Sequence, residues 1–324
     1  MIRNPEDLLD KPKRIRMLIA GYPGIGKTTC ALSAPKALHI DVDFGVDRIE
    51  PRYRRPFIQP SSYDEILDDL VPMKLTDFDT LVFDTGGKLI NLMGLWAIKK
   101  DPKNAKRDGS LSLAGYGVIG KEFVRLMDYC FYELDKHIVV VFHSIEEKDG
   151  DNVRLRLMVE GQTRNTVWVP MDFGGFMEMY GNDRTLGLSN CERYYAKGTR
   201  GINGVKKIPE LTEKTGNDFL TRLFDDYNAK AAKEIEATTE QRQIYSGAIE
   251  TGNAIIRTVT DPDSALAAIT ALKEIKHALT SEREVNATFN AHVKMLGLTY
   301  DKTQKKYIKP QASDAGEPEP TEVQ

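Results

Sequence analysis

The 324-residue sequence predicts an α/β fold built around a mainly parallel central sheet. Between residue 14 and about residue 225, short β-rich apolar runs alternate with segments of helical periodicity, as in parallel α/β proteins. A glycine-rich turn separates the first apolar run from a helix-compatible stretch, and the next two apolar runs each end in an aspartate. Strands followed by polar turns and helices in this order favour a single parallel sheet covered by helices.

The elements of this region can be placed in order. The parallel strands are expected at residues 15–20, 37–41, 80–84 and 137–143. The helices are expected at residues 28–34, 63–71, 88–99 and 118–134, the last with apolar residues at helical spacing. After Gly150 the pattern changes to short alternating runs, which predict antiparallel edge strands at residues 153–159, 166–169, 176–180 and 193–196.

The remainder of the chain differs in composition. Residues 1–13 form a polar lead-in, and residues 14–225 form the α/β core. Residues 226–309 are rich in Ala, Glu and Lys and predict a small helical C-terminal region, with a break near Asp261-Pro262 and a further helix at 281–296. Residues 310–324 carry four acids and no base, and their Pro- and Glu-rich composition predicts a disordered acidic tail.

Composition restricts the functional classes. Hydrophobic residues make up 41% and charged residues 29% of the chain, which is ordinary for a soluble protein. The longest purely apolar run, residues 138–142, is too short to span a membrane, and no signal peptide is evident. The three cysteines have no pairing or metal-ligand spacing, so a reduced, cytoplasmic setting is expected. The net charge of −3 comes mainly from the tail, so a local basic patch could still bind nucleic acid.

The glycine-rich turn matches the phosphate-binding loop pattern G-x-x-x-x-G-K-[ST] in full. Glycine allows successive backbone N–H groups to converge on phosphate oxygens, and the following helix presents its positive end to the same anion. Lys27 is expected to neutralise the β- and γ-phosphates, and the Thr28 hydroxyl to bind Mg²⁺. The motif therefore predicts a site for ATP and Mg²⁺. Its residues are Gly21, Tyr22, Pro23, Gly24, Ile25, Gly26, Lys27, Thr28 and Thr29.

Carboxylates after the next strands complete the predicted site. Asp84 ends an apolar strand and is expected to hold Mg²⁺ through water, with turn capping before Gly86 as the alternative. Asp43 is the first choice for orienting the attacking water. Strand alternation would place Asp41 on the same face as Asp43, so the sequence does not separate the two. His143, at the end of the fourth strand, is either a sensor of the γ-phosphate or a structural residue.

With these motifs the chain resembles the RecA-like ATPase core, a P-loop NTPase fold. More narrowly, it resembles the phage-encoded RecA-like single-strand annealing proteins, over about residues 14 to 225. The resemblance implies that Asp43 activates water, although these relatives usually carry Glu there, and that Lys197 and Arg200 reach the nucleotide of a neighbouring subunit. It rests on Gly-Tyr-Pro-Gly-Ile-Gly-Lys-Thr-Thr (21–29), Ile-Asp-Val-Asp-Phe-Gly (40–45), Leu-Val-Phe-Asp-Thr (81–85), Val-Val-Phe-His-Ser (140–144) and Ala-Lys-Gly-Thr-Arg-Gly (196–201).

A basic segment at residues 99–107, followed by a Gly/Ser loop up to residue 117, lies where RecA-like proteins carry a DNA-contacting loop. Its lysine and arginine side chains would neutralise phosphates, and Tyr116 would stack on a nucleobase. The alternative is a solvated charged face. The DNA-binding candidates are Lys99, Lys100, Lys103, Lys106, Arg107 and Tyr116. A second candidate loop, residues 146–156, is poorer for phosphate because of its acids, although Arg154, Arg156 and Arg164 lie near it, and a third cluster is Arg52, Arg54 and Arg55. The resemblance implies further partners: other copies of the chain in a filament or ring, and a single-strand binding protein, all in the cytoplasm of a bacterial host.

The leading functional hypothesis is an ATP-dependent single-stranded-DNA-binding recombinase that promotes strand annealing in phage DNA metabolism. A P-loop ATPase acting on a protein partner, such as a helicase loader or packaging accessory factor, is the first alternative. The second is an ATP-binding switch that barely hydrolyses, a hypothesis that the aspartate at position 43, in place of the usual Glu, keeps open. A nucleoside monophosphate kinase is disfavoured because the sequence shows no Arg-rich lid near a second phosphate site.

Overall fold

The computed structural model describes residues 13–150 and 152–309. The chain divides into two compact units between Ala231 and Ala232. The first unit holds a mixed sheet and its covering helices, and the second is mainly helical. The predicted α/β class, with a mainly parallel sheet, antiparallel edge strands and a helical C-terminal region, is confirmed. The polar lead-in before Lys13 and the tail from residue 310 lie outside the described residues.

The sheet of the first unit is parallel from β3 to β7, and β8 and β9 extend it in antiparallel fashion. A further strand, β6, pairs antiparallel with the outer half of β5. Because β5 lies between β1 and β4, the ends of β1, β5, β4 and β2 are neighbours at one edge. In spatial order the strands are β3 (Phe57–Ile58), β2 (Ala37–Asp41), β4 (Thr80–Asp84), β5 (His137–Asp149), β1 (Arg16–Gly21), β7 (Phe173–Tyr180), β8 (Asp183–Gly187) and β9 (Val205–Lys207), with β6 (Asn152–Leu157) paired to β5.

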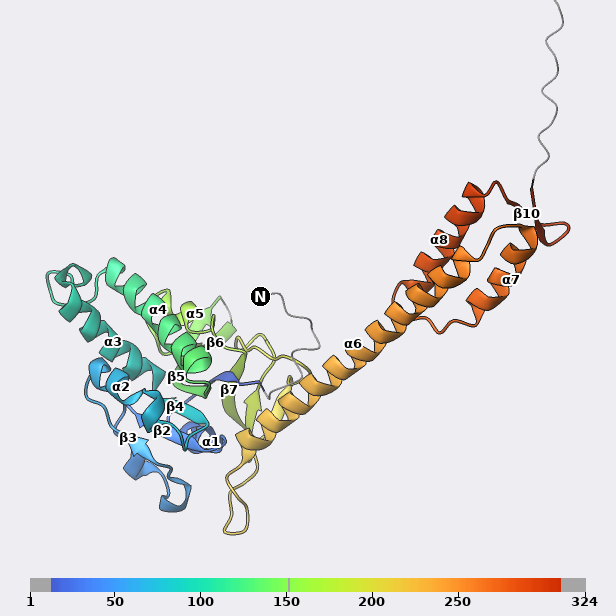
Figure 1. Cartoon of the computed structure of the whole chain (residues 1–324). Helices are drawn as coiled ribbons and strands as arrows, with labels where there is room; N and C mark the ends of the chain where they lie inside the picture. The colour runs from blue at the N-terminus through green and yellow to red at the C-terminus, as the bar shows by residue number, and fades with distance from the viewer. Residues whose placement is uncertain (1–12, 151, 310–324) are drawn as a thin grey trace, which may run out of the picture. The chain divides into compact units, whose positions relative to one another are not determined.

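Alternate residues of each central strand pack into two separate cores. Leu18 of β1 packs on the side of α2 (Tyr63–Asp69), α3 (Gly86–Lys100) and α4 (Leu113–Asp128). Its neighbour Met17 packs on the side of α1 (Lys27–Ala31) and the start of α6 (Phe219–Arg257). Figure 1 shows α3 and α4 lying together over the sheet. Burial on both faces explains why these strands read as continuous apolar runs.

Several predicted elements differ from the observed ones. The strand expected at 166–169 is wrong: Thr163–Thr166 forms the short helix α5, followed by turns. Thr163 and Val167 are both buried, at the i, i+4 spacing of a helical face, which a β-branched composition concealed. The strand expected at 193–196 is also wrong, since that segment makes one isolated bridge, from Tyr194 to Leu155. The strand expected at 176–180 is present within β7, but it is not an antiparallel edge strand: it lies inside the sheet, parallel to β1 and antiparallel to β8. The helix predicted at 118–134 begins earlier, at Leu113, and its last turn, Tyr129–Glu133, widens to π geometry.

The second unit has its own apolar core. It consists of the C-terminal part of α6, α7 (Pro262–Lys273), α8 (Ser281–Met295) and a hairpin of β10 (Thr299–Asp301) and β11 (Lys306–Ile308). The predicted break is present, because Asp261 caps α7 by accepting from Ser264 N at 2.9 Å. Among the residues described, no helix is long and apolar enough to cross a membrane.

Candidate nucleotide-binding site

The phosphate loop connects the end of β1 to the start of α1, as its motif predicts. Gly24 and Gly26 have φ values of 79° and 89°, which residues with a side chain rarely adopt. Gly21 serves a different purpose, because a Cβ there would lie 2.8 Å from the carbonyl oxygen of Met177 on β7. Gly26 provides no side-chain cap for α1, so the first N–H groups of this helix remain available for an anion.

The two residues expected to bind Mg²⁺ lie together. Thr28 Oγ1 donates to Asp84 Oδ2 at 2.5 Å, across 56 residues of sequence. Asp84 is 6% exposed and ends β4. One hydroxyl and one carboxylate, completed by substrate phosphates and water, form the oxygen donor set that Mg²⁺ prefers. The described residues contain no cluster of three or more His, Cys, Asp or Glu that could hold a metal without such a substrate.

Lys27 is almost completely buried within the loop. Its Nζ donates to the carbonyl oxygen of Tyr22 at 2.8 Å, and only 5% of the residue is exposed. Burial lowers the pKa of Lys27 to about 8, and the nearby carboxylates of Asp84 and Asp43 oppose this shift. Lys27 is therefore still mostly cationic at pH 7, in a position to meet a polyphosphate.

Asp41 and Asp43 have different environments. Asp41 is 1% exposed and accepts hydrogen bonds from Gly45 N at 2.8 Å, Val46 N at 2.9 Å and Gln59 Nε2 at 2.8 Å. These bonds fasten the turn that follows β2. Asp43 instead lines the cavity beside the phosphate loop. The expectation that alternation places both on one face is wrong, because β2 ends at Asp41 and the chain then turns.

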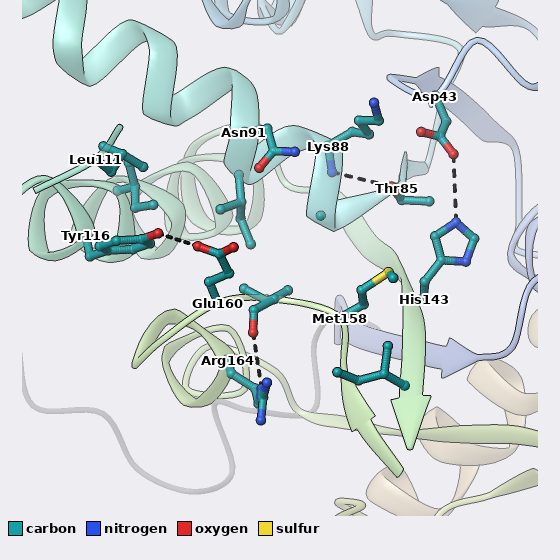
Figure 2. A pocket seen from close by; sticks show the side chains of 15 residues that line it. Asp43, Thr85, Lys88, Asn91, Leu111, Tyr116, His143, Met158, Glu160 and Arg164 are labelled. Carbon is teal, nitrogen blue, oxygen red and sulfur yellow. Dashed lines mark hydrogen bonds and ion pairs between the residues drawn. The ribbon is translucent and has the colours of Figure 1, made fainter. Parts of the chain in front are cut away.

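His143 lies opposite Asp43. Its Nε2 is 3.8 Å from Asp43 Oδ2, and Figure 2 shows the two side chains facing each other from β5 and the turn after β2. Burial lowers the pKa of His143, the charge of Lys27 lowers it further, and Asp43 opposes both effects. A pKa below the usual value means that the imidazole is mainly neutral at pH 7.

These groups surround one cavity of about 240 Å³. The sequence did not identify two nearby cations: one lines this cavity, and the other lies beside the phosphate loop. Arg48 lines the cavity and donates from Nη2 to the carbonyl oxygen of Asp43 at 3.3 Å. Arg184 comes from β8, and its Nε would lie 3.3 Å from a Cβ added at Gly26. The cavity is lined by Pro23, Gly24, Gly26, Lys27, Thr28, Thr29, Asp43, Gly45, Arg48, Ile49, Asp84, Thr85 and His143.

A buried histidine behind the site was also missed. His39 is fully buried on β2, with Nε2 3.5 Å from Asp84 Oδ2 and 3.9 Å from Asp41 Oδ1. Its position is determined by the register of β2 against β4, which the sequence does not specify.

A second, larger cavity of about 490 Å³ begins at Asp43, Thr85 and His143 and extends between α3, α4 and the segment after β6. Figure 2 shows it, with the hydroxyl of Tyr116 donating to Glu160 at the far end. Tyr116 belongs to α4, so its expected place in a Gly/Ser loop is wrong. Ser112 caps this helix by accepting from Gly115 N at 3.2 Å, which explains why the loop ends early.

The basic candidates lie on the surface at the α3–α4 connection. Lys99 and Lys100 belong to the last turn of α3. Lys99 Nζ is 3.2 Å from Asp64 Oδ2, and Lys100 Nζ lies 4.2 Å from the centroid of the Trp96 ring. Three further exposed bases follow, namely Lys103, Lys106 and Arg107. All five side chains are exposed and close in sequence, and their binding to DNA stays a prediction.

The two cations expected to act on a neighbouring subunit lie outside this chain's own nucleotide cavity. Lys197 Nζ donates to the carbonyl oxygen of Met171 at 2.5 Å. The guanidinium of Arg200 lies 5.5 Å from the centroid of the Tyr227 ring. Their role between subunits stays a prediction.

The phosphate loop and the mainly parallel sheet define an ATPase-type P-loop domain. The family described as AAA domain matches residues 13–200, and the chain belongs to this family. Among solved structures, the crystal structure of flagellar accessory protein FlaH from Methanocaldococcus jannaschii is similar at 10% identity and a TM-score of 0.22. That match covers 61% of this chain and 91% of FlaH. No curated protein matches the sequence.

Proposed function

We propose that the protein hydrolyses ATP and that its nucleotide cycle controls binding and annealing of single-stranded DNA by an assembly of several copies. The main support for ATP hydrolysis is the 2.5 Å hydrogen bond from Thr28 to Asp84 in the cavity that Lys27 also lines. Asp43 and His143 line the same cavity. The DNA part is supported by the sequence resemblance and by the basic surface at the α3–α4 connection.

Each residue has a definite task in this proposal. The loop N–H groups and Lys27 hold the β- and γ-phosphates, while Thr28 and Asp84 hold Mg²⁺, which when bound neutralises phosphate charge. Asp43 orients the attacking water and accepts its proton. Neutral His143 faces Asp43 with Nε2 3.8 Å from Oδ2, slightly longer than a direct hydrogen bond, so a small shift of either side chain would form that bond and hold Asp43 in place.

His143 also offers a route from nucleotide to DNA. Together with Asp43 and Thr85 it borders both the nucleotide cavity and the larger cavity of Figure 2. A change in γ-phosphate occupancy that moves these side chains would therefore alter the shape of the larger cavity. Coupling of this kind must be reciprocal: nucleotide changes DNA affinity by the same factor by which DNA changes nucleotide affinity.

The test is the affinity for a fluorescent oligo(dT) strand, measured with ADP and with a non-hydrolysable ATP analogue. We expect at least about a fivefold difference between the two nucleotide states, the low end of typical allosteric coupling. Lys27→Met should remove the difference while keeping most of the apolar stem. Equal affinity in both states would contradict the proposed coupling. If the protein binds no DNA with ADP and none with the ATP analogue, the function shifts to an ATPase that acts on a protein partner.

A further inference from the structure

A separate cavity lies on the β6–α5 side of the first unit, and none of the phosphate-loop residues line it. Its volume of about 430 Å³ is within the range of small-ligand sites. We call it the aromatic cavity. Its lining residues are Leu155, Arg156, Leu157, Arg164, Asn165, Trp168, Val169, Phe176, Tyr195 and Lys197.

Two aromatic rings shape one wall of the aromatic cavity. Trp168 and Tyr195 meet edge to face, with centroids 5.0 Å apart and planes at 83°. Trp168 is 9% exposed, whereas Tyr195 is 48% exposed, so a fixed ring supports one that is open to solvent. Phe176 also lines the cavity and is stacked on Tyr194. An open tyrosine ring on a rigid support is a surface on which a flat aromatic group can stack.

Three cations line the same cavity, and among the described residues no Asp or Glu does. Arg164 Nη1 is 2.9 Å and Arg156 Nε 3.5 Å from the same carboxylate oxygen of Glu147. Lys197 is held by its bond to the carbonyl oxygen of Met171. One carboxylate thus orients two guanidinium groups. Because three cations line the cavity and Glu147 balances one positive charge, the lining keeps a net positive charge. Oriented cations beside an aromatic wall favour a ligand that carries both a ring and an anion.

Arg164 connects the aromatic cavity to the cavity of Figure 2. It lines both, and its Nε donates to the carbonyl oxygen of Val159 at 3.1 Å. The larger cavity reaches His143 at the nucleotide site. A ligand that contacts Arg164 would therefore lie one side chain away from the cavity that borders the nucleotide.

We propose that the aromatic cavity binds a nucleotide unit of single-stranded DNA. The base stacks on Tyr195 against Trp168, and the flanking phosphates contact Arg156, Arg164 and Lys197. A single strand suits this arrangement, because its bases are unstacked and every base has a π-face. The inference rests on the proposed DNA binding. It adds a binding position for one nucleobase, which the lysine and arginine side chains of the α3–α4 connection do not provide.

Tryptophan fluorescence tests the contact directly. The chain has two tryptophans, so Trp96→Phe leaves Trp168 as the single reporter. We expect saturating oligo(dT) to quench this signal, and we expect thymidine monophosphate at the same nucleotide concentration to leave it nearly unchanged. Equal quenching by the monophosphate would overturn the assignment to a DNA strand and indicate a site for free nucleotide.

Affinity measurements on the full chain complete the test. Tyr195→Ala should weaken oligo(dT) binding by at least about fivefold, the low end for loss of one stacked base. Tyr180→Ala is the matched control, since Tyr180 is 83% exposed and lines none of these cavities.

The salt dependence of binding tests the phosphate contacts. Arg156→Gln should reduce the magnitude of the slope of log affinity against log salt concentration by about 0.7, the value for one lost phosphate contact on a single strand. Lys121→Gln, at an exposed position on α4, is the charge control.

The outcomes separate this inference from the proposed function. One outcome would overturn the aromatic cavity as the site but leave the DNA-binding function intact: the protein binds DNA, Tyr195→Ala binds it equally well, and DNA does not quench Trp168. An absence of DNA binding by the unaltered protein would overturn both. Quenching by oligo(dT) together with a selective loss in Tyr195→Ala would support the inference.

Discussion

Individual side chains at the nucleotide site differ in how far the sequence could identify them. Thr28 and Lys27 belong to one contiguous motif, so their place at the cavity could be predicted from local sequence. Asp84 followed from its place at a strand end. Arg48 and His39 could not be predicted, because their positions depend on a turn and on strand register. The choice between Asp41 and Asp43 likewise required the turn after β2, where only Asp41 is held by backbone N–H groups.

The lowered pKa of Lys27 predicts a pH-dependent nucleotide affinity. A bound polyphosphate raises the pKa of Lys27, so above about pH 8 the complex holds more protons than the free protein. Affinity for ATP should therefore fall by about twofold between pH 7 and pH 8 and by about tenfold at pH 9. Binding titrations across this range check the result. Lys27→Arg, which stays charged, should remove the decline; an affinity that rises with pH would contradict the assignment.

The two aspartates should respond differently to neutralisation. Asp43→Asn should lower the turnover of ATP by about 10² or more, the usual effect of losing a general base, with nucleotide affinity changed by less than about threefold. Asp41→Asn should instead destabilise the fold by about 1–3 kcal/mol, because a buried acceptor of three hydrogen bonds is disrupted. Turnover and thermal unfolding of both variants check this. A catalytic loss confined to Asp41→Asn would reverse the assignment.

Among the elements, most helices and central strands could be predicted from periodicity, whereas α5, β8 and β9, between β6 and α6, could not. The stretch at 166–169 is short and β-branched, but it forms the end of α5 and the turns after it, with Val167 buried against the core of the first unit. The short antiparallel strands β8 and β9 carry no apolar alternation of sufficient length. Tertiary packing overrides local preference in such short elements.

Helix α4 gives a matched test of packing. A Cβ at Gly115 would lie 2.5 Å from the carbonyl oxygen of Asn104, whereas one at Gly117 would meet nothing within 4 Å. Gly117→Ala should stabilise the protein by about 0.5–1 kcal/mol, the usual gain within a helix. Gly115→Ala should destabilise it, because backbone at Asn104 must move. Chemical denaturation of both variants gives the two free energies; equal effects would show that α4 does not pack as described.

For the whole molecule, the fold and the AAA domain family account for a nucleotide site formed where four parallel strands end. Composition could predict the mainly helical second unit but not the hairpin that closes its core, because β10 and β11 have three residues each. The site and the larger cavity share three residues, so a ligand in one is in a position to influence the other.

The most direct test of the central claim is the steady-state rate of ATP hydrolysis with and without single-stranded DNA, with Lys27→Ala as the blank. We predict Mg²⁺-dependent hydrolysis that single-stranded DNA increases several-fold and that the blank lacks. A rate that is the same with and without DNA, or the same as that of the blank, would contradict a DNA-coupled ATPase.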